Sequence, residues 1–207
     1  TLALDHGAAA IESVVSPRAQ QWHGIGLPEQ LKEDQEAQEW SDRLTNFLFK
    51  KRYGAPSNFA SQLHECYLSL LAFGNCVMSV EDMLDGNIRY KANHVKEHYY
   101  MENRHGFVDV DYRKYELTAR QIIEKFGEKA PEKVKTAMEK TPSEKFTLLH
   151  VVMPDEDNES GFPFVSYHIC VDTKDIIHVG GYRTFPYIIS RWTTTAGETY
   201  GRSPAMS

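Results

Sequence analysis

Cysteine is scarce in this chain. Only three cysteines occur among 207 residues, and no two of them stand in C-x-x-C spacing. An odd number of cysteines without that spacing argues against a disulfide framework and favours reduced thiols in an intracellular setting. We therefore expect Cys66, Cys76 and Cys170 to pack as small, buried hydrophobic side chains.

Long apolar runs are absent as well. The stretch over residues 2–15 is interrupted by Asp5, His6 and Glu12, and no other run approaches the roughly 20 residues that a membrane-spanning helix requires. The sequence therefore predicts no membrane partner. With 41% hydrophobic and 12% aromatic residues, the chain nevertheless has enough apolar side chains for a packed core.

Basic runs are missing too, and the formal net charge is −6. Sequence-specific nucleic-acid binding needs a basic stripe that grips phosphates, so this composition disfavours it. The chain also lacks a glycine-rich phosphate loop, a G-x-S-x-G elbow and a local Cys-His signature. The sequence alone therefore assigns no catalytic, cofactor-binding or metal-ligating residue.

Helical periodicity dominates the first third of the sequence. Apolar side chains recur there at three- and four-residue spacing, which places them on one face of each predicted helix. We expect this helical part to extend over about residues 1–73. Residues that stop or cap helices mark its three segments: Pro17 after the first, Pro28 and Gly54 around the second, and Ser57 and Gly74 around the third.

Beyond residue 74 the pattern changes to short β-branched and aromatic runs, separated by turn residues at 85–86 and 105–106. Two further helical segments, 118–126 and 131–138, interrupt these runs. The acidic stretch at 155–159 is typical of a loop tip. The predicted strands are residues 76–80, 87–91, 98–101, 107–112, 146–153, 164–171, 176–179 and 187–190.

This order of elements predicts an α+β fold. N-terminal helices are expected to pack on an antiparallel, partly mixed β-sheet that carries an inserted helical pair. The sequence shows neither internal repeats nor low-complexity linkers, so we expect one domain over residues 1–207. Its sheet-rich part should extend over about residues 74–192.

One motif suggests metal chemistry. His94, Glu97 and His98 fit the H-x-x-E-H spacing of zinc hydrolases, in which two imidazoles one helical turn apart bind the metal. That geometry requires a helix, whereas the runs on both sides of the motif are strand-like. A solvated turn with incidental histidines is the favoured interpretation, and a zinc-dependent hydrolase remains an alternative function.

A second alternative is a non-enzymatic protein-binding module. Aromatic side chains are frequent in the predicted strands, and the surface is expected to be acidic. Basic residues are too few among these aromatics to hold a nucleic-acid backbone, so half-buried sheet positions explain the aromatics better.

An ordered series of short motifs runs through nearly the whole chain and resembles the head-to-tail connector, or portal, proteins of short-tailed bacteriophages. The opening Ser16-Pro17 followed by Trp22 also resembles the start of that family's N-terminal region. The series comprises Ser57-Asn58-Phe59, Leu71-Ala72-Phe73-Gly74, Gly106-Phe107-Val108-Asp109 with Arg113, Thr118-Ala119-Arg120-Gln121 before Phe126-Gly127, His150-Val151 before Pro154, Arg191-Trp192, Gly197-Glu198 and Tyr200-Gly201-Arg202-Ser203.

The resemblance implies a structural virion protein, not an enzyme, that forms a homo-oligomeric, dodecameric ring at one capsid vertex. Double-stranded DNA would pass through the ring during packaging and ejection, without sequence specificity. Terminase, capsid and tail adaptor proteins are the implied partners, and assembly would take place in the host cytoplasm. The net acidity suits a DNA conduit, because tight phosphate contacts would hinder sliding.

The resemblance also implies that the end of the chain joins a peripheral wing region to a long stem helix. Ser203 followed by Pro204 is typical of a helix N-terminus, so we expect a stem helix to start over residues 203–207 of a longer polypeptide. Candidate residues for this junction and for subunit packing are Arg191, Trp192, Tyr200, Gly201, Arg202, Ser203 and Pro204.

Roles for some of these residues follow from their chemistry. Gly201 should supply a turn that a β-carbon would oppose. Trp192 is expected to be a packing anchor between wing and stem in preference to a ligand platform. Arg202 either pairs with an acidic group of a neighbouring subunit or is a solvated surface residue. Ring formation also predicts unpaired strand edges and moderately apolar patches on opposite sides of the domain.

Overall fold

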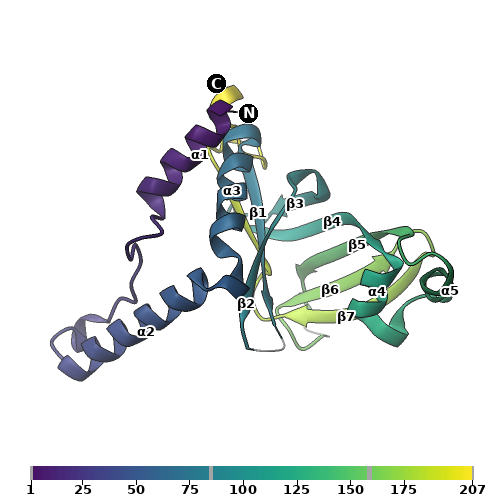
Figure 1. Ribbon diagram of the computed structural model, residues 1–207, viewed down its shortest axis with the longest axis horizontal. Helices are drawn as coiled ribbons and strands as arrows, with labels where there is room; N and C mark the ends of the chain where they lie inside the picture. The colour runs from purple at the N-terminus through teal and green to yellow at the C-terminus, as the bar shows by residue number, and fades with distance from the viewer. Residues whose placement is uncertain (1, 84–85, 158–159, 207) are drawn as a thin grey trace. The chain divides into compact units, whose positions relative to one another are not determined.

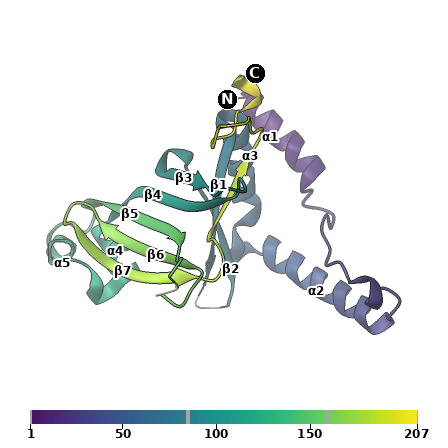
Figure 2. The ribbon, with the colours of Figure 1, turned by 180° about the vertical axis from the view of Figure 1, so that it is seen from behind.

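The computed structural model describes residues 2–83, 86–157 and 160–206 (Figures 1 and 2). The chain forms two compact units, of which the first comprises Thr1–Asn93 with Tyr187–Ser207 and the second His94–Pro186. Helices and antiparallel sheets occur together, which confirms the α+β class. The expectation of one domain over the whole chain stays a prediction.

The first unit begins with helices. Its long helices are α1 (Leu2–Val15), α2 (Gln35–Tyr53) and α3 (Phe59–Phe73), and the short 3-10 turns η1 (Glu29–Leu31) and η2 (Ala55–Ser57) lie between them. Within the described ranges, every helix of the chain is too short or too polar to span a bilayer.

The second helix starts later than the sequence pattern indicated. Pro28 precedes only the short turn η1, and α2 begins at Gln35. The Asp34 side chain caps α2, because it accepts a hydrogen bond from the Ala37 N–H. A capping carboxylate satisfies one of the free N–H groups of a first turn, which fixes the start of this helix better than the proline does.

Helix α1 packs against α3 at close range (Figure 1). Ala8 is fully buried, and a β-carbon on Gly7 would lie 2.9 Å from Leu71 Cδ1, so small residues permit the approach. At the end of α1, the Ser16 hydroxyl lies 2.8 Å from the Tyr67 hydroxyl in a buried hydrogen bond. The interface therefore combines small side chains with a satisfied polar pair.

Helix α3 covers a three-stranded antiparallel sheet of order β2-β1-β8. Its strands are β1 (Asn75–Asp82), β2 (Ile88–Asn93) and β8 (Tyr187–Arg191). Cys66 of α3 packs with Cys76 and Met78 of β1 in the core between helix and sheet. Both cysteines, like Cys170 of the second unit, are free and buried, which confirms the expectation of buried thiols.

The second unit is built on a five-stranded antiparallel sheet of order β3-β4-β5-β6-β7. The strands are β3 (His98–Glu102), β4 (Val108–Thr118), β5 (Lys145–Pro154), β6 (Phe164–Cys170) and β7 (Asp175–Tyr182). The short turn η3 (Val95–Glu97) precedes them.

A helical pair is inserted between β4 and β5, as the sequence predicted. It consists of α4 (Ala119–Phe126), the turn η4 (Gly127–Lys129) and α5 (Glu132–Lys140). Thr118 and Gln121 form a capping box that starts α4. The helices share one core with the sheet, in which Ile122, Val134, Phe146, Leu148 and Cys170 are among the buried residues.

Two details of the predicted sheet are wrong. The strands form two sheets instead of one, and every pairing among the named strands is antiparallel, so neither sheet is mixed over the residues that the structure describes. Strands β2 and β3 are not partners, because β2 belongs to the first unit, whereas the turn η3 and β3 after it belong to the second.

Three predicted features fall partly outside the described residues. These are the turn at 85–86, the acidic loop tip at 155–159 and the helix start at 203–207, which include residues 85, 158, 159 and 207.

Candidate functional site

The H-x-x-E-H motif does not adopt the helical geometry that a zinc site requires. His94 is the N-cap of turn η3, and Glu97 accepts two hydrogen bonds of 3.0 Å from Arg113. His98 lies on β3, where its Nδ1 is 2.9 Å from Asp111 Oδ2 and both side chains are fully buried. Across the described ranges, no three His, Cys, Asp or Glu side chains are grouped to hold a metal ion. The structure does not favour the hydrolase alternative.

The segment that follows β8 is tied to the start of β1 by Asn75. The Asn75 Nδ2 donates to the carbonyls of Phe73, at 2.8 Å, and Gly201, at 3.0 Å. Its Oδ1 accepts a hydrogen bond of 2.7 Å from the Gly201 N–H. Asn75 is buried, so these bonds form away from water, where unpaired backbone groups are costly. One amide thereby joins parts of the chain 126 residues apart.

Two glycines permit this approach. A β-carbon on Gly201 would lie 2.5 Å from the Gly74 carbonyl oxygen, and one on Gly74 would lie 2.4 Å from the backbone of Arg202 and Ser203. Gly74 also has a φ of +74°, which few other residues adopt. The sequence indicated Gly74 only as the end of a helix, whereas its contact with the closing segment depends on the tertiary fold.

Further backbone bonds close the segment into a narrow loop. The Trp192 N–H donates to the Gly74 carbonyl and the Arg202 N–H to the Thr193 carbonyl, each at 2.8 Å. The Arg191 guanidinium donates to the Thr199 carbonyl at 3.0 Å. The two ends of the loop, at Trp192 and Gly201, are thus hydrogen-bonded to residues 74 and 75.

The remaining candidate junction residues have distinct surroundings. Trp192 and Tyr200 are 45% and 41% exposed. Ser203 is buried, and its hydroxyl accepts a hydrogen bond of 3.2 Å from the Ala205 N–H at the start of the short turn η5 (Pro204–Met206). This geometry agrees with a capping serine before a helical turn. The role of these residues at a wing–stem junction stays a prediction.

Arg202 pairs within its own chain. Its guanidinium makes a two-bond ion pair with Glu198, in which Nε donates to Oε2 at 2.8 Å. The hydrogen bond to Arg202 lowers the pKa of Glu198, and the same bond raises the pKa of Arg202. The pair is solvated, so its contribution to stability is small and sensitive to salt.

A row of three histidines crosses the sheet of the second unit, and sequence reasoning did not identify it. His150 of β5 faces His168 of β6, and His168 faces His178 of β7 in the strand register. The first two rings stack in parallel, with centroids 4.0 Å apart and planes at 3°, and the next pair of centroids is 6.0 Å apart. The His150 Nε2 lies 2.8 Å from the Ser166 hydroxyl. Only the strand register, which the sequence does not reveal, could have indicated the row.

Burial keeps the inner two imidazoles neutral. Loss of solvent, followed by the nearby positive groups of His168, Lys125 and Arg113, lowers the pKa of His150 to about 2. Burial and the charge of Lys125 likewise lower the pKa of His168 to about 3. Both rings are therefore uncharged at neutral pH and can each act as one donor and one acceptor.

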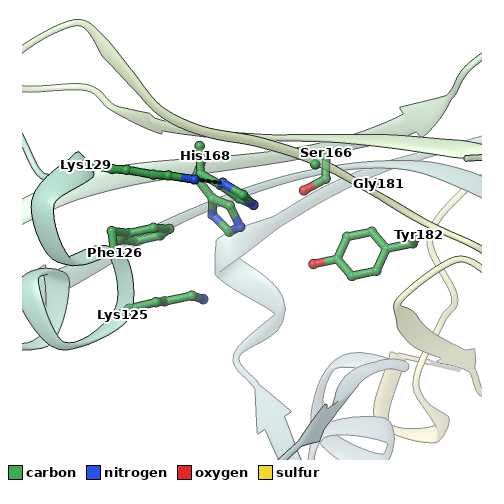
Figure 3. A pocket seen from close by; sticks show the side chains of 9 residues that line it. Lys125, Phe126, Lys129, Ser166, His168, Gly181 and Tyr182 are labelled. Carbon is green, nitrogen blue, oxygen red and sulfur yellow. Dashed lines mark hydrogen bonds between the residues drawn. The ribbon is translucent and has the colours of Figure 1, made fainter. Parts of the chain in front are cut away.

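A cavity of about 390 Å³ lies beside this row (Figure 3). Helix α4 and turn η4 contribute Lys125, Phe126 and Lys129, and strands β6 and β7 contribute Ser166, His168 and Tyr182. The Lys129 ammonium donates to His178 Nδ1 at 3.3 Å. Among the described residues, no carboxylate lines the cavity. The site can therefore donate several hydrogen bonds and is electropositive.

Comparison with known proteins shows similarity along the whole chain. A family model described as bacteriophage head to tail connecting protein matches residues 1–207. A probable portal protein of Bordetella phage BPP-1 is 26% identical over 218 residues, which cover 100% of this chain and 39% of the relative. A portal protein of Salmonella phage epsilon15 is 26% identical over 175 residues, which cover 79% of this chain and 31% of the relative. The chain thus spans less than half the length of each of these relatives.

Proposed function

Because the chain belongs to the family of bacteriophage head to tail connecting proteins, we propose that it is a structural part of a phage portal ring. The ring stands at one vertex of the capsid, conducts double-stranded DNA during packaging and ejection, and attaches the tail. The observation that carries this proposal is the match of the family model over residues 1–207. The two curated relatives, both described as portal proteins, support it.

The charge of the chain is compatible with a DNA conduit. The formal net charge is −6, and no basic stripe runs along the sequence. A protein that neutralises many phosphates binds DNA tightly, and this chain lacks the basic stripe that such binding needs. The proposal therefore includes passage of DNA without sequence specificity and no enzymatic role for this part of the protein.

The edges of the five-stranded sheet support contacts between subunits. Strands β3 and β7 form its two edges, and a strand at an edge can pair with or pack against another chain. Tyr99 and Met101 are exposed on β3, while Ile176 and Val179 are exposed on β7. Different apolar surfaces on opposite edges suit a head-to-tail ring, in which one face of each subunit meets the other face of the next.

The closing segment of the first unit is proposed as the junction between wing and stem. Its ties through Asn75, Gly74 and Gly201 hold the backbone at Ser203 in a fixed place within that unit. In the longer protein, Pro204 would begin the stem helix, and Trp192 would pack between stem and wing. Arg191, Tyr200 and Arg202 complete this proposed junction.

The partners of the ring follow from the same proposal. A dodecamer of the full-length protein would contact capsid proteins at the vertex. Terminase would dock on the ring during packaging, and a tail adaptor would bind it afterwards. Assembly is proposed to take place in the host cytoplasm, before the ring becomes part of the virion.

The test uses the longer protein that contains this chain. Electron microscopy of the purified protein, with native mass spectrometry to count subunits, is expected to show closed dodecameric rings. A variant with Asn75→Ala addresses the junction, because loosening it should lower the fraction of closed rings. Gln35→Ala, on the exposed start of α2, is the control and should leave ring closure unchanged. A full-length protein that stays monomeric under all conditions would refute the proposal.

A further inference from the structure

We propose that the cavity beside the histidine row binds a small phosphate-bearing anion about the size of a nucleoside monophosphate. The proposal concerns the second unit alone and is independent of ring formation. It depends on the charge of the cavity, the placement of its donors, an unsatisfied buried imidazole nitrogen and the size of the space.

The cavity concentrates positive charge in an acidic chain. The chain has 29 acidic and 23 basic residues, yet two lysines, Lys125 and Lys129, line the cavity and, within the described residues, no carboxylate does. Burial and the charges of these two lysines also lower the pKa of His178, as expected where positive potential accumulates. An anion entering the cavity would offset this positive potential.

The donors are directed toward a common space. Figure 3 shows the Lys125 ammonium and the Tyr182 hydroxyl pointing toward each other from α4 and β7, with the His168 ring beside them. Lys129 is held near the same row by its 3.3 Å bond to His178. Ammonium and hydroxyl groups converging from different elements can serve several oxygens of one tetrahedral anion.

One buried nitrogen of a residue that lines the cavity lacks a hydrogen-bond partner. Within the described part of the chain, the Nδ1 of His168 is buried and makes no hydrogen bond, and the residue as a whole is 5% exposed. An unsatisfied buried polar atom costs roughly 1–3 kcal/mol and calls for an explanation. His168 lines the cavity, and in the tautomer protonated at Nδ1 its ring has a hydrogen bond left to donate.

The geometry favours an anion over a metal ion. The imidazoles of His150 and His168 stack with planes at 3° and centroids 4.0 Å apart, so their nitrogen lone pairs lie in two separate parallel planes. Metal ligands must instead converge on one point. A phosphate needs donors that approach from several sides, which the lysines, hydroxyl groups and imidazole provide.

The size and walls of the cavity indicate more than a bare phosphate. A volume of about 390 Å³ lies within the range of roughly 300–1,000 Å³ that is typical of small-molecule sites. The rings of Phe126 and Tyr182 supply aromatic walls next to the polar donors. A nucleoside monophosphate offers both parts, a phosphate for the lysines and a flat base for the rings.

The experiment titrates the 207-residue chain in phosphate-free buffer at pH 7.5 and follows the imidazole signals by NMR. Its three ligands are inorganic phosphate, deoxyadenosine monophosphate and deoxyadenosine. We expect saturable shifts of the His168 and His178 signals with both phosphates and tighter binding of the nucleotide. Equal affinities for the two phosphates would support a site for the phosphate group and overturn the assignment of the base.

Charge-removing variants test whether the cavity causes these shifts. Lys125→Gln and Lys129→Gln should each weaken binding about tenfold, because each removes one charged hydrogen bond. Lys140→Gln removes the same charge from an exposed site on α5 and should bind like the parent chain. Circular dichroism confirms that each variant is folded. Absence of saturable shifts, binding that survives both cavity variants, or equally tight binding of deoxyadenosine would overturn the proposal.

Discussion

The neutral histidines of the second unit should make its stability depend on pH. In the unfolded chain an imidazole has a pKa near 6.5, whereas in the folded unit the pKa of His150 is about 2 and that of His168 about 3. Below pH 6.5 the unfolded state therefore takes up protons that the folded state does not. The second unit therefore keeps its full stability above pH 6.5, and its free energy of unfolding falls as the pH decreases from 6.5 toward 3.

The magnitude follows from linkage. Each histidine whose folded pKa is this low costs about 1.4 kcal/mol per pH unit below 6.5. Between pH 7.5 and 5.5 the two residues together should lower the free energy of unfolding by about 2.7 kcal/mol. This is a large share of the roughly 5–15 kcal/mol that stabilises a typical domain. His178, whose pKa burial also lowers, adds to the loss in the same direction.

Urea unfolding at pH 7.5, 6.5 and 5.5 can measure this effect. The three tryptophans, Trp22, Trp40 and Trp192, all belong to the first unit, so their fluorescence reports on that unit. Far-UV circular dichroism detects both units, and the transition that tryptophan fluorescence does not follow belongs to the second. His168→Gln should remove about 1.4 kcal/mol of the pH-dependent loss, because one strongly shifted titration is removed.

The exposed His6 provides a matched control, since His6→Gln removes an imidazole from the first unit and should leave the transition of the second unit unchanged. NMR titration of the imidazoles gives an independent measurement. If the His150 and His168 signals both titrate near pH 6.5, or if the second unit is equally stable at pH 7.5 and 5.5, the reasoning is refuted.

Three further predictions concern the closing segment and the sheet edge. Asn75→Ala should lower the free energy of unfolding by about 3 kcal/mol, because three hydrogen bonds of about 1 kcal/mol each are lost. Urea unfolding followed by tryptophan fluorescence would measure this loss. A loss below about 0.5 kcal/mol would contradict the role given to this amide. Gly74→Ala should lower the free energy of unfolding by about 3 kcal/mol, because the new β-carbon clashes with nearby backbone and the residue has a positive φ. Gly197→Ala is the control: it has a positive φ but open space around it, so it should cost about 1 kcal/mol in the same assay. Equal losses would show that crowding at residue 74 is unimportant. In the longer protein, the double variant Ile176→Asp and Val179→Asp should lower the fraction of closed rings seen by electron microscopy. Thr136→Asp, at an exposed position of α5, is the control and should leave that fraction unchanged. An undiminished fraction of closed rings in the double variant would exclude the β7 edge from the interface.

Local signals in the sequence located most elements correctly. The helical segment expected over residues 118–126 is α4, and Gly74 ends α3 in the left-handed conformation. Such signals depend on residues within one or two turns of each other, so they can be recognised without knowledge of the fold. Where a local signal was ambiguous, as at Pro28, the cap at Asp34 decided the start of the helix.

Pairing between distant strands could not be predicted in the same way. Alternating side chains indicate that a segment is a strand, but they do not specify its partner. Strand β8 returns across the sequence to pair with β1, so the strands form two sheets where one was expected. The histidine row has the same origin, since His150, His168 and His178 become neighbours only through the register of three strands.

Gly74 illustrates how a correct local explanation can conceal a second constraint. Its positive φ fully accounts for a glycine at the end of α3, so the sequence alone indicates no second constraint at this residue. The structure brings Gly201, Arg202 and Ser203 so close that a β-carbon at residue 74 would overlap their backbone. Because the turn and the contact act on the same atoms, only a comparison with a glycine such as Gly197, which has the turn without the contact, separates their free energies.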